Sequence, residues 1–75
     1  MDDVIYEVPV LGALIRKRRK ALDYTQAKIA ALCGTGVRFI SDLENGKETI
    51  ELGKALTVAS TLGIDVIAKV RGTAS

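Results

Sequence analysis

The stretch that decides the fold runs from Thr25 to Gly46 and reads TQAKIAALCGTGVRFISDLENG. Its two halves have the apolar spacing of short helices, and Gly34-Thr35-Gly36 separates them. Glycine readily adopts the left-handed backbone angles that a tight corner between helices requires. Thr25 is a favourable N-cap for the first half. We therefore predict two short helices, ending near residue 33 and spanning about residues 37–45, joined by a sharp glycine turn.

A basic helix is predicted before this stretch. Pro9 suits a first helical turn, and the segment from Val10 to about Leu22 places Leu11 and Ile15 on one apolar stripe, with Leu22 at its end. Residues 1–9, rich in β-branched and aromatic types, are predicted to form an extended arm or a short strand.

A hydrophobic helix and a strand are predicted after it. Thr49 is a plausible cap for a helix that runs to about Leu62, and Gly63 ends that helix. Its predicted apolar stripe consists of Leu52, Ala55, Leu56, Ala59 and Leu62. Residues 64–71 alternate in polarity, as a strand does, and residues 72–75 are expected to be a frayed tail. The apolar face of this strand is formed by Ile64, Val66, Ala68 and Val70.

Two charged residues fall on stripes that otherwise face the core. Arg19 lies one turn after Ile15, and Glu44 lies beside Leu43 in the predicted third helix. Burying either charge alone would cost several kcal/mol or more. We therefore predict that Arg19 and Glu44 form an internal ion pair that joins the first helix to the third.

The chain has 75 residues, so it forms one domain with a small core, and oligomerisation is a natural supplement to its stability. A lone strand cannot satisfy its own backbone. The C-terminal strand must pair with the N-terminal segment, with a second chain, or with both, and we favour a homodimer. The predicted fold is mainly α, with four to five helices and short terminal strands; residues 10–63 form the principal domain.

Charge and composition exclude several functions. One cysteine and no histidine leave no usual zinc set and no histidine base, so we expect no enzyme, no catalytic residue, no metal and no cofactor. No apolar run is long enough to cross a bilayer, and the acidic N-terminus is unlike a signal peptide; we expect a cytoplasmic, nucleoid-associated protein without a membrane partner. Residues 10–47 carry eight basic and three acidic side chains. This favours a phosphate-bearing partner, although a basic run can also be only a solvated face.

Residues 11–63 resemble the phage repressor and Cro-like, or XRE-type, helix-turn-helix regulators. The resemblance rests on the spacing of Arg16, Arg19 and Gln26, on Gly34 at the corner, and on FISDLENGK at residues 39–47. The continuation ELGK at residues 51–54, with LGID at 62–65 and a C-terminal strand, resembles HipB-type antitoxins.

The resemblance implies a set of DNA contacts. The third helix would lie in the major groove and read base edges, with Arg38 bonded to guanine. The implied base-reading residues are Val37, Arg38, Ser41 and Asp42. The implied phosphate-binding residues are Arg16, Lys17, Gln26, Thr35, Asn45 and Lys47. The implied partners are a palindromic double-stranded DNA operator, a second copy of the chain and a cognate toxin protein.

The sequence departs from the family's pattern at two positions that concern specificity. Gly36 replaces the serine or threonine that often caps the recognition helix, and Asp42 replaces an amide, so that phosphates would repel it unless it has a partner. Three functions remain open: an autoregulating antitoxin and repressor, a phage or restriction-system regulator without a toxin, and a protein-interaction module in which DNA binding is secondary. Phe39 and Cys33 are interpreted as core or semi-core residues rather than functional ones.

Overall fold

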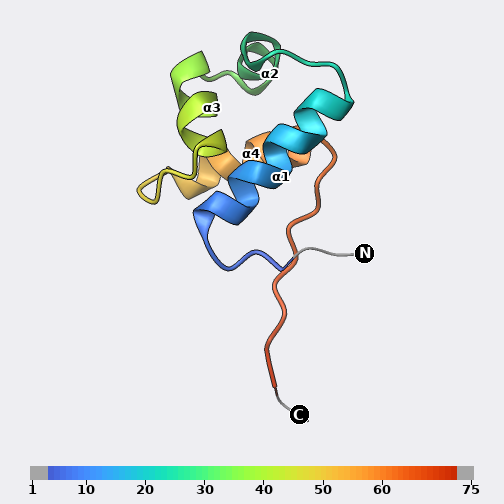
Figure 1. Ribbon diagram of the computed structural model, residues 1–75, viewed down its shortest axis with the longest axis vertical. Coiled ribbons are helices and arrows are strands. Elements are labelled where there is room, and N and C mark those ends of the chain that lie inside the picture. Colours follow the sequence, from blue (N-terminus) through green and yellow to red (C-terminus); the bar gives the residue numbers. More distant parts are fainter. Residues whose placement is uncertain (1–3, 73–75) are drawn as a thin grey trace.

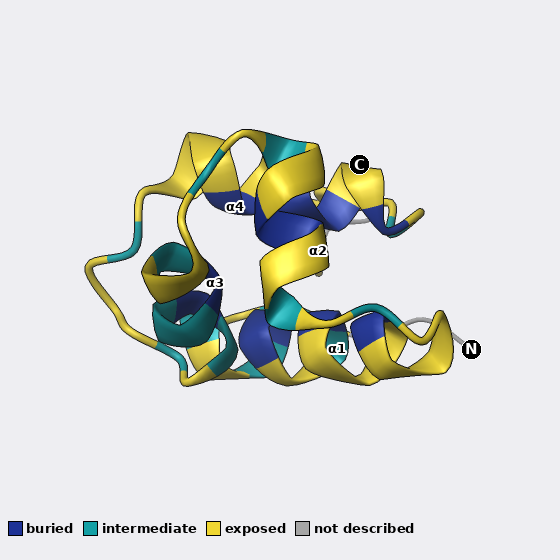
Figure 2. Ribbon diagram, turned by 90° about the horizontal axis from the view of Figure 1, so that it is seen from above, coloured by how far each residue is buried: buried dark blue, intermediate teal, exposed yellow. Residues whose placement is uncertain are grey.

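The computed structural model describes residues 4–72 and contains four helices in that range. They are α1 (Val8–Ala21), α2 (Gln26–Cys33), α3 (Val37–Glu44) and α4 (Leu52–Thr61). Seen along the molecule, α1 and α4 lie on opposite sides, with α2 and α3 between them (Figure 2). The four-helix, all-α architecture confirms the helical part of the predicted fold.

The core lies where the inner faces of the four helices meet (Figure 2). Ile15, Ile29, Ile40, Leu43 and Val58 are fully buried, one or two from each helix. Burying a branched aliphatic side chain of this size stabilises a fold by about 1.5–3 kcal/mol. Five half-buried apolar residues, together with Cys33 and Phe39, pack against this cluster: Ile5, Val8, Tyr24, Ile50 and Ile64. The interpretation of Phe39 and Cys33 as semi-core residues is confirmed.

The first and third helices approach each other closely at Gly12. A Cβ atom at this position would overlap the carbonyl oxygen of Leu43, well inside van der Waals contact. Only glycine allows the backbones of α1 and α3 to pack at this distance. This contact brings α1, the basic helix, against the C-terminal end of α3.

The start of α4 and both ends of α1 differ from the sequence predictions. The N-cap of α4 is Glu51, whose carboxylate accepts from the Lys54 backbone N–H, so the prediction that Thr49 is the cap is wrong. A carboxylate at this position also interacts favourably with the helix dipole, which a threonine hydroxyl does not. At the other flank, α1 begins two residues earlier than predicted, with Pro9 in its first turn, and ends before Leu22.

Part of the predicted α4 stripe is not buried. Leu52 is 61% exposed and Leu56 39% exposed, whereas Val58, which the prediction omitted, is fully buried. Only the neighbours of a helix decide which flank of a broad apolar stripe is covered, so periodicity alone could not make this choice.

The terminal strands are not formed within residues 4–72. Residues 64–71 are extended without regular secondary structure, and no backbone hydrogen bond joins residues 65–72 to the rest of the described chain. Both terminal segments lead away from the helices (Figure 1). The strand prediction fails for the single chain because strand backbone needs a paired neighbour, and the described part of this fold has no sheet edge to supply one. The outer parts of the predicted arm and tail, residues 1–3 and 73–75, lie outside the described residues.

A contact that the sequence did not predict holds the end of α4. Arg18 donates from Nε to the carbonyl oxygen of Leu62 at 2.9 Å, joining α1 to the residue that caps α4. Carbonyl groups at a helix C-terminus lack intrahelical partners and carry partial negative charge, so a guanidinium is a favourable ligand for them. Arg18 therefore has a structural contact, whereas the basic run suggested only solvent or phosphate for it.

We expect Arg18→Ala to lower the thermal midpoint by about 4–8 °C, which corresponds to about 1 kcal/mol for a partly exposed charged hydrogen bond. Lys20→Ala, an exposed basic residue of the same helix, is the matched control and should leave the midpoint nearly unchanged. Thermal denaturation followed by circular dichroism measures both. Equal midpoints for the two variants would show that the contact adds no stability.

Candidate nucleic-acid interface

The site begins with α2, the corner and α3. The Thr25 hydroxyl accepts from the Lys28 backbone N–H at 3.0 Å, so the predicted cap of α2 is confirmed. Gly34 ends α2 with φ at +69°, the left-handed conformation that its position in the sequence predicted. Gly36 precedes α3 without a side-chain cap. The first backbone N–H groups of α3 are therefore not satisfied by a capping side chain.

An ion pair ties this unit to α1. Arg19 donates from Nε to Glu44 Oε2 at 2.6 Å and from Nη2 to Oε1 at 3.0 Å, a two-pronged contact. The third guanidinium nitrogen of Arg19, Nη1, donates to the carbonyl oxygen of Tyr24 at 2.7 Å. The two side chains are only 9% and 3% exposed. The pair that the stripe pattern predicted thus exists, and it joins α1, the α1–α2 connection and the end of α3.

Both members of the pair are held in their charged forms. The hydrogen bond to Glu44 raises the pKa of Arg19 above its ordinary value, against the opposing effect of burial. Burial alone would raise the pKa of Glu44, but hydrogen bonds from Arg19 and Gln26, with the nearby positive charges of Arg19 and Arg16, outweigh it and lower that pKa. The network is therefore ionised at neutral pH.

Gln26 is part of this network. Its side-chain Nε2 donates to Glu44 Oε1 at 3.1 Å, so α2 is bonded directly to the end of α3. The resemblance assigned Gln26 to a phosphate. In this structure one N–H of its amide is directed to Glu44, so a phosphate contact at the start of α2 would use the second N–H of this amide or the backbone N–H groups of the first turn.

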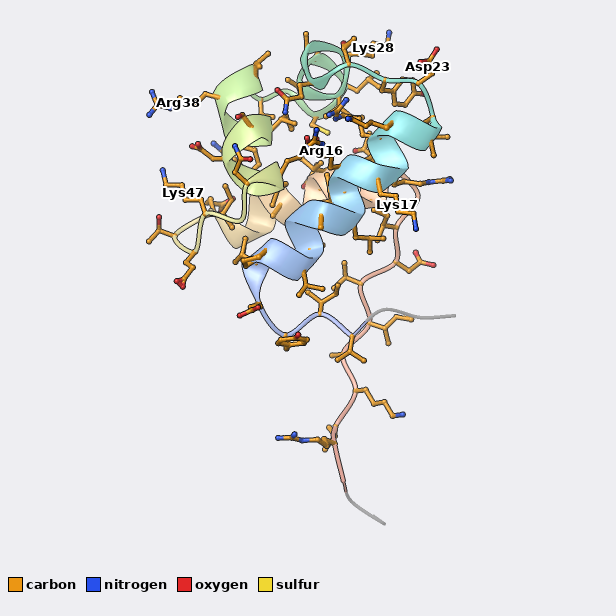
Figure 3. The ribbon with its side chains drawn as sticks, viewed as in Figure 1. Arg16, Lys17, Asp23, Lys28, Arg38 and Lys47 are labelled. Carbon is orange, nitrogen blue, oxygen red and sulfur yellow. The ribbon has the colours of Figure 1, made fainter. Side chains whose placement is uncertain are left out.

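The outer face of α3 carries the residues implied to read bases. Arg38 is exposed and projects outward from α3, on the same side as Lys47 (Figure 3). Val37 is 46% exposed, which is compatible with an apolar contact to a partner. Ser41 and Asp42 are half-buried one turn further along. The structure thus brings the four implied base-reading residues onto one short helix.

The basic side chains of α1 are divided between two sides of the helix. Arg16 lies one turn after Gly12 and one turn before Arg19, which both contact α3, and it lies on that side of α1 (Figure 3). Lys17 points away from them (Figure 3) and lines a shallow apolar hollow with Val10 and Leu14. The structure therefore groups Arg16, but not Lys17, with Arg38 and Lys47.

Two other implied phosphate-binding residues have contacts within the chain. The Asn45 side-chain amide donates to the Ser41 hydroxyl at 3.4 Å, which joins the C-cap residue to the preceding turn of α3. Thr35 lines a pocket of about 100 Å³ with Lys54 and Thr57 of α4. Thr35 therefore lies next to α4, whereas Asn45 lies beside Lys47.

The four residues implied in dimerisation fall into two groups. Ile64 is half-buried against the core, and its backbone N–H donates to the Ala59 carbonyl at 2.9 Å. Val66 and Val70 are 43% and 84% exposed, and Ala68 is also exposed. Ile64 thus anchors the segment, and the apolar residues beyond it are exposed in the described chain, Val66 in part and Val70 almost completely.

Comparison with solved structures supports the fold. The HipB–O4 20mer complex matches with a TM-score of 0.83 over 95% of this chain and 100% of that chain, at 20% identity. The complex of a HipB point variant with an O2 20mer has a TM-score of 0.85, with 96% and 100% coverage and 21% identity. The HipA–HipB–O2–O3 complex has a TM-score of 0.84, with 95% and 100% coverage and 20% identity. At these identities the likeness concerns the fold alone.

Comparison of sequences identifies the family. Residues 15–67 match the family described as helix-turn-helix. Over 60 residues, 77% of this chain and 79% of the relative, the chain is 48% identical to the uncharacterized HTH-type transcriptional regulator y4mF of Sinorhizobium fredii. No helix within residues 4–72 is long and apolar enough to cross a membrane. The chain belongs to the XRE-type helix-turn-helix family of DNA-binding transcriptional regulators, which is not a family of enzymes.

Proposed function

We propose that the protein is a sequence-specific repressor that acts as a homodimer and, as the antitoxin of a toxin–antitoxin pair, represses its own promoter. The DNA-binding part rests on the outer face of α3, which carries the exposed Arg38 and the polar residues Ser41 and Asp42. The buried Arg19–Glu44 ion pair holds this helix against α1. The resemblance of residues 51–54 and 62–65 to HipB-type antitoxins, with the shared fold, supports the antitoxin part.

In the proposed complex, α3 lies in the major groove. Arg38 makes a bidentate contact to guanine, Val37 meets a thymine methyl group, and Ser41 and Asp42 reach the next base edges. The Arg19–Glu44 pair holds α3 at a constant angle to α1 and α2, so the base-reading side chains stay in register with the phosphates.

The proposed phosphate contacts come from Arg16 on α1, the N-terminal turn of α2, and Asn45 with Lys47 after α3. A backbone contact is independent of base sequence and releases counterions. These residues therefore supply affinity and orientation, and the residues on α3 supply discrimination.

We expect Arg16→Ala to lower affinity for operator and mixed-sequence DNA by similar factors, and to reduce the slope of log affinity against log salt by about 0.9. Lys17→Ala is the matched control, because Lys17 points away from this face (Figure 3), and should change the slope much less. Fluorescence anisotropy over a salt series measures the slopes. If Lys17→Ala lowers DNA affinity more than Arg16→Ala does, the side of α1 that carries Lys17 must face the DNA.

We propose that residues 64–71 form a strand that pairs with the same segment of a second chain. Its exposed valines at 66 and 70 and the unbonded backbone of residues 65–71 support this, because both need a partner that residues 4–72 of one chain do not supply. A two-fold dimer would place two α3 helices about 34 Å apart, one turn of DNA, and so would recognise a palindrome.

Truncation after Gly63 tests the dimer. We expect the full chain to be dimeric by light scattering and the truncated chain to be monomeric, with weaker binding to a palindromic site and nearly unchanged binding to a half-site. The double variant Val66→Ser and Val70→Ser, which keeps the length of the chain, controls for the deletion and should also be monomeric. A full chain that is monomeric at micromolar concentration would refute strand exchange.

A second candidate function is capture of a protein partner, with DNA binding secondary. Leu52 and Leu56 on α4 expose apolar surface one turn apart, in addition to that of the C-terminal segment. Unpaired apolar patches of this kind mark protein interfaces. The two functions separate in co-purification with the product of the neighbouring gene: a complex that forms equally well with Arg38→Ala would show that partner capture does not depend on DNA reading.

A further inference from the structure

The end of α3 folds back on itself and brings together two residues with opposite charge. Gly46, with φ at +77°, turns the chain, and the backbone N–H of Lys47 then donates to the Asp42 carbonyl at 3.0 Å. In the same turn the Lys47 ammonium lies 3.5 Å from Asp42 Oδ2. The backbone of this turn therefore places Lys47 within reach of the Asp42 carboxylate.

The two members of this pair belong to different parts of the proposed interface. Asp42 lies on the outer side of α3 among the residues proposed to read bases, and its side chain is 31% exposed. Lys47, with a side chain that is 53% exposed, lies on the side of α3 to which Arg38 projects, among the residues proposed to bind phosphate (Figure 3). Of the two carboxylates on α3, Glu44 is already paired with Arg19, which leaves Asp42 as the one on the outer side of the helix.

DNA acts on the two charges in opposite directions. A phosphate attracts the ammonium of Lys47 and repels the carboxylate of Asp42. While Lys47 faces Asp42, part of its charge is neutralised within the protein and is not available to a phosphate. If Lys47 moves to a phosphate, Asp42 loses its counter-charge within the negative potential of the groove, unless a donor such as the cytosine amino group bonds to its carboxylate.

We propose that Asp42 is a specificity-determining residue that acts through Lys47: the pair lowers affinity for DNA of arbitrary sequence, and the pair opens without this loss only where a base in the groove donates to Asp42. This inference rests on the proposed function, DNA binding through α3. It assigns to Asp42 a repulsive role toward wrong sites in addition to an attractive one toward the right site, which is a common way to obtain specificity.

The energy scale of the pair suits this role. An exposed ion pair at this separation is worth little to stability, so opening it does not disrupt the fold. The same carboxylate, left unpaired beside phosphates, has a strong effect on association because the charge density of DNA is high. The predicted effect therefore appears in DNA affinity and salt dependence, and not in the thermal midpoint.

The test is a double-mutant cycle of Asp42→Asn and Lys47→Ala, measured by fluorescence anisotropy on a mixed-sequence duplex over a salt series. We expect Asp42→Asn to raise affinity for this duplex about five- to tenfold at low salt and to steepen the salt slope by about one. In the Lys47→Ala background we expect the same substitution to raise affinity by a factor about two to five times smaller, since there it removes only the repulsion between Asp42 and the phosphates and releases no cation. Asp42→Ala also removes the charge and favours helix, so it controls for an effect of the asparagine amide on α3. We expect it to give the same two results.

Asp65→Asn controls for net charge, because it makes the same change on an exposed residue of the C-terminal segment. An equal rise in affinity for Asp42→Asn and Asp65→Asn, or an equal rise in both Lys47 backgrounds, would overturn the role of the pair. Unchanged affinity in both Asp42 variants would overturn it as well. A wild-type protein that binds neither this duplex nor any duplex selected from a random pool would instead refute the proposed function, which separates the two failures.

Discussion

Replacement of Glu44 by alanine is expected to lower the free energy of unfolding by about 3–5 kcal/mol and the thermal midpoint by about 15–30 °C. The reason is that the substitution leaves the Arg19 guanidinium, whose side chain is 9% exposed, without its carboxylate, and leaves Gln26 without its acceptor. A domain of 75 residues has a stability of only about 4–11 kcal/mol, so the variant would be largely unfolded near physiological temperature. Urea denaturation followed by circular dichroism measures the change.

Two comparisons make this result specific. Glu48→Ala removes an exposed carboxylate from the loop after α3 and should change stability by less than about 0.5 kcal/mol. The double replacement of Arg19 by methionine and Glu44 by leucine should recover most of the lost stability, because an apolar pair of similar volume leaves no uncompensated charge. A Glu44→Ala variant within about 1 kcal/mol of wild type, by the same measurement, would mean that the pair is not a structural anchor.

The same carboxylate sets a pH dependence of stability. Because the pKa of Glu44 in the folded chain lies below its ordinary value of 4.5, its contribution is complete above that value. The contribution is lost as the pH falls from 4.5 through the lower pKa of the folded state. Urea denaturation at decreasing pH should therefore show a steeper acid loss for wild type than for Glu44→Gln.

Replacement of Arg38 by alanine is expected to weaken binding to a selected operator about 10- to 100-fold per subunit, with a much smaller loss on mixed-sequence DNA. A bidentate arginine–guanine contact carries about 1–3 kcal/mol of discrimination, whereas the charge of Arg38 alone carries no sequence information. Selection from a random pool of duplexes, repeated with the variant, should show one position of the site relaxed in each half.

Arg38→Lys is the informative companion, since it keeps the charge and loses the planar pair of donors. It should restore affinity for mixed-sequence DNA without restoring the relaxed position. If Arg38→Ala selects the same operator as wild type with the same affinity, base reading must be assigned to other residues of α3.

Local chemistry in the sequence was enough for most of the fold. Thr25 caps α2 and Gly34 ends it as their types predict, because a cap and a left-handed corner depend on a few neighbouring residues. The Arg19–Glu44 pair was also predictable, since a charge on an apolar stripe must have a partner and each stripe has one such charge.

Other features depend on which elements become neighbours. Arg18 binds the end of α4, 44 residues away, and Gln26 turns its amide to Glu44 instead of outward; neither follows from spacing along the chain. The exposure of Leu52 and Leu56 likewise depends on which flank of α4 the other helices cover. The C-terminal segment shows the same dependence, because a strand exists only beside another strand.

The stretch from Thr25 to Gly46 contains both kinds of feature, those that the local sequence determines and those that depend on tertiary packing. Its helix starts, its glycine corner and the charges on its inner stripe are properties of residues a few positions apart, and the sequence by itself determined them. Only the tertiary structure decided that Arg16 faces this unit while Lys17 does not, that Gln26 joins the buried network, and that the turn after α3 brings Lys47 to Asp42. These choices depend on the angles and distances between packed helices, and no periodicity encodes them.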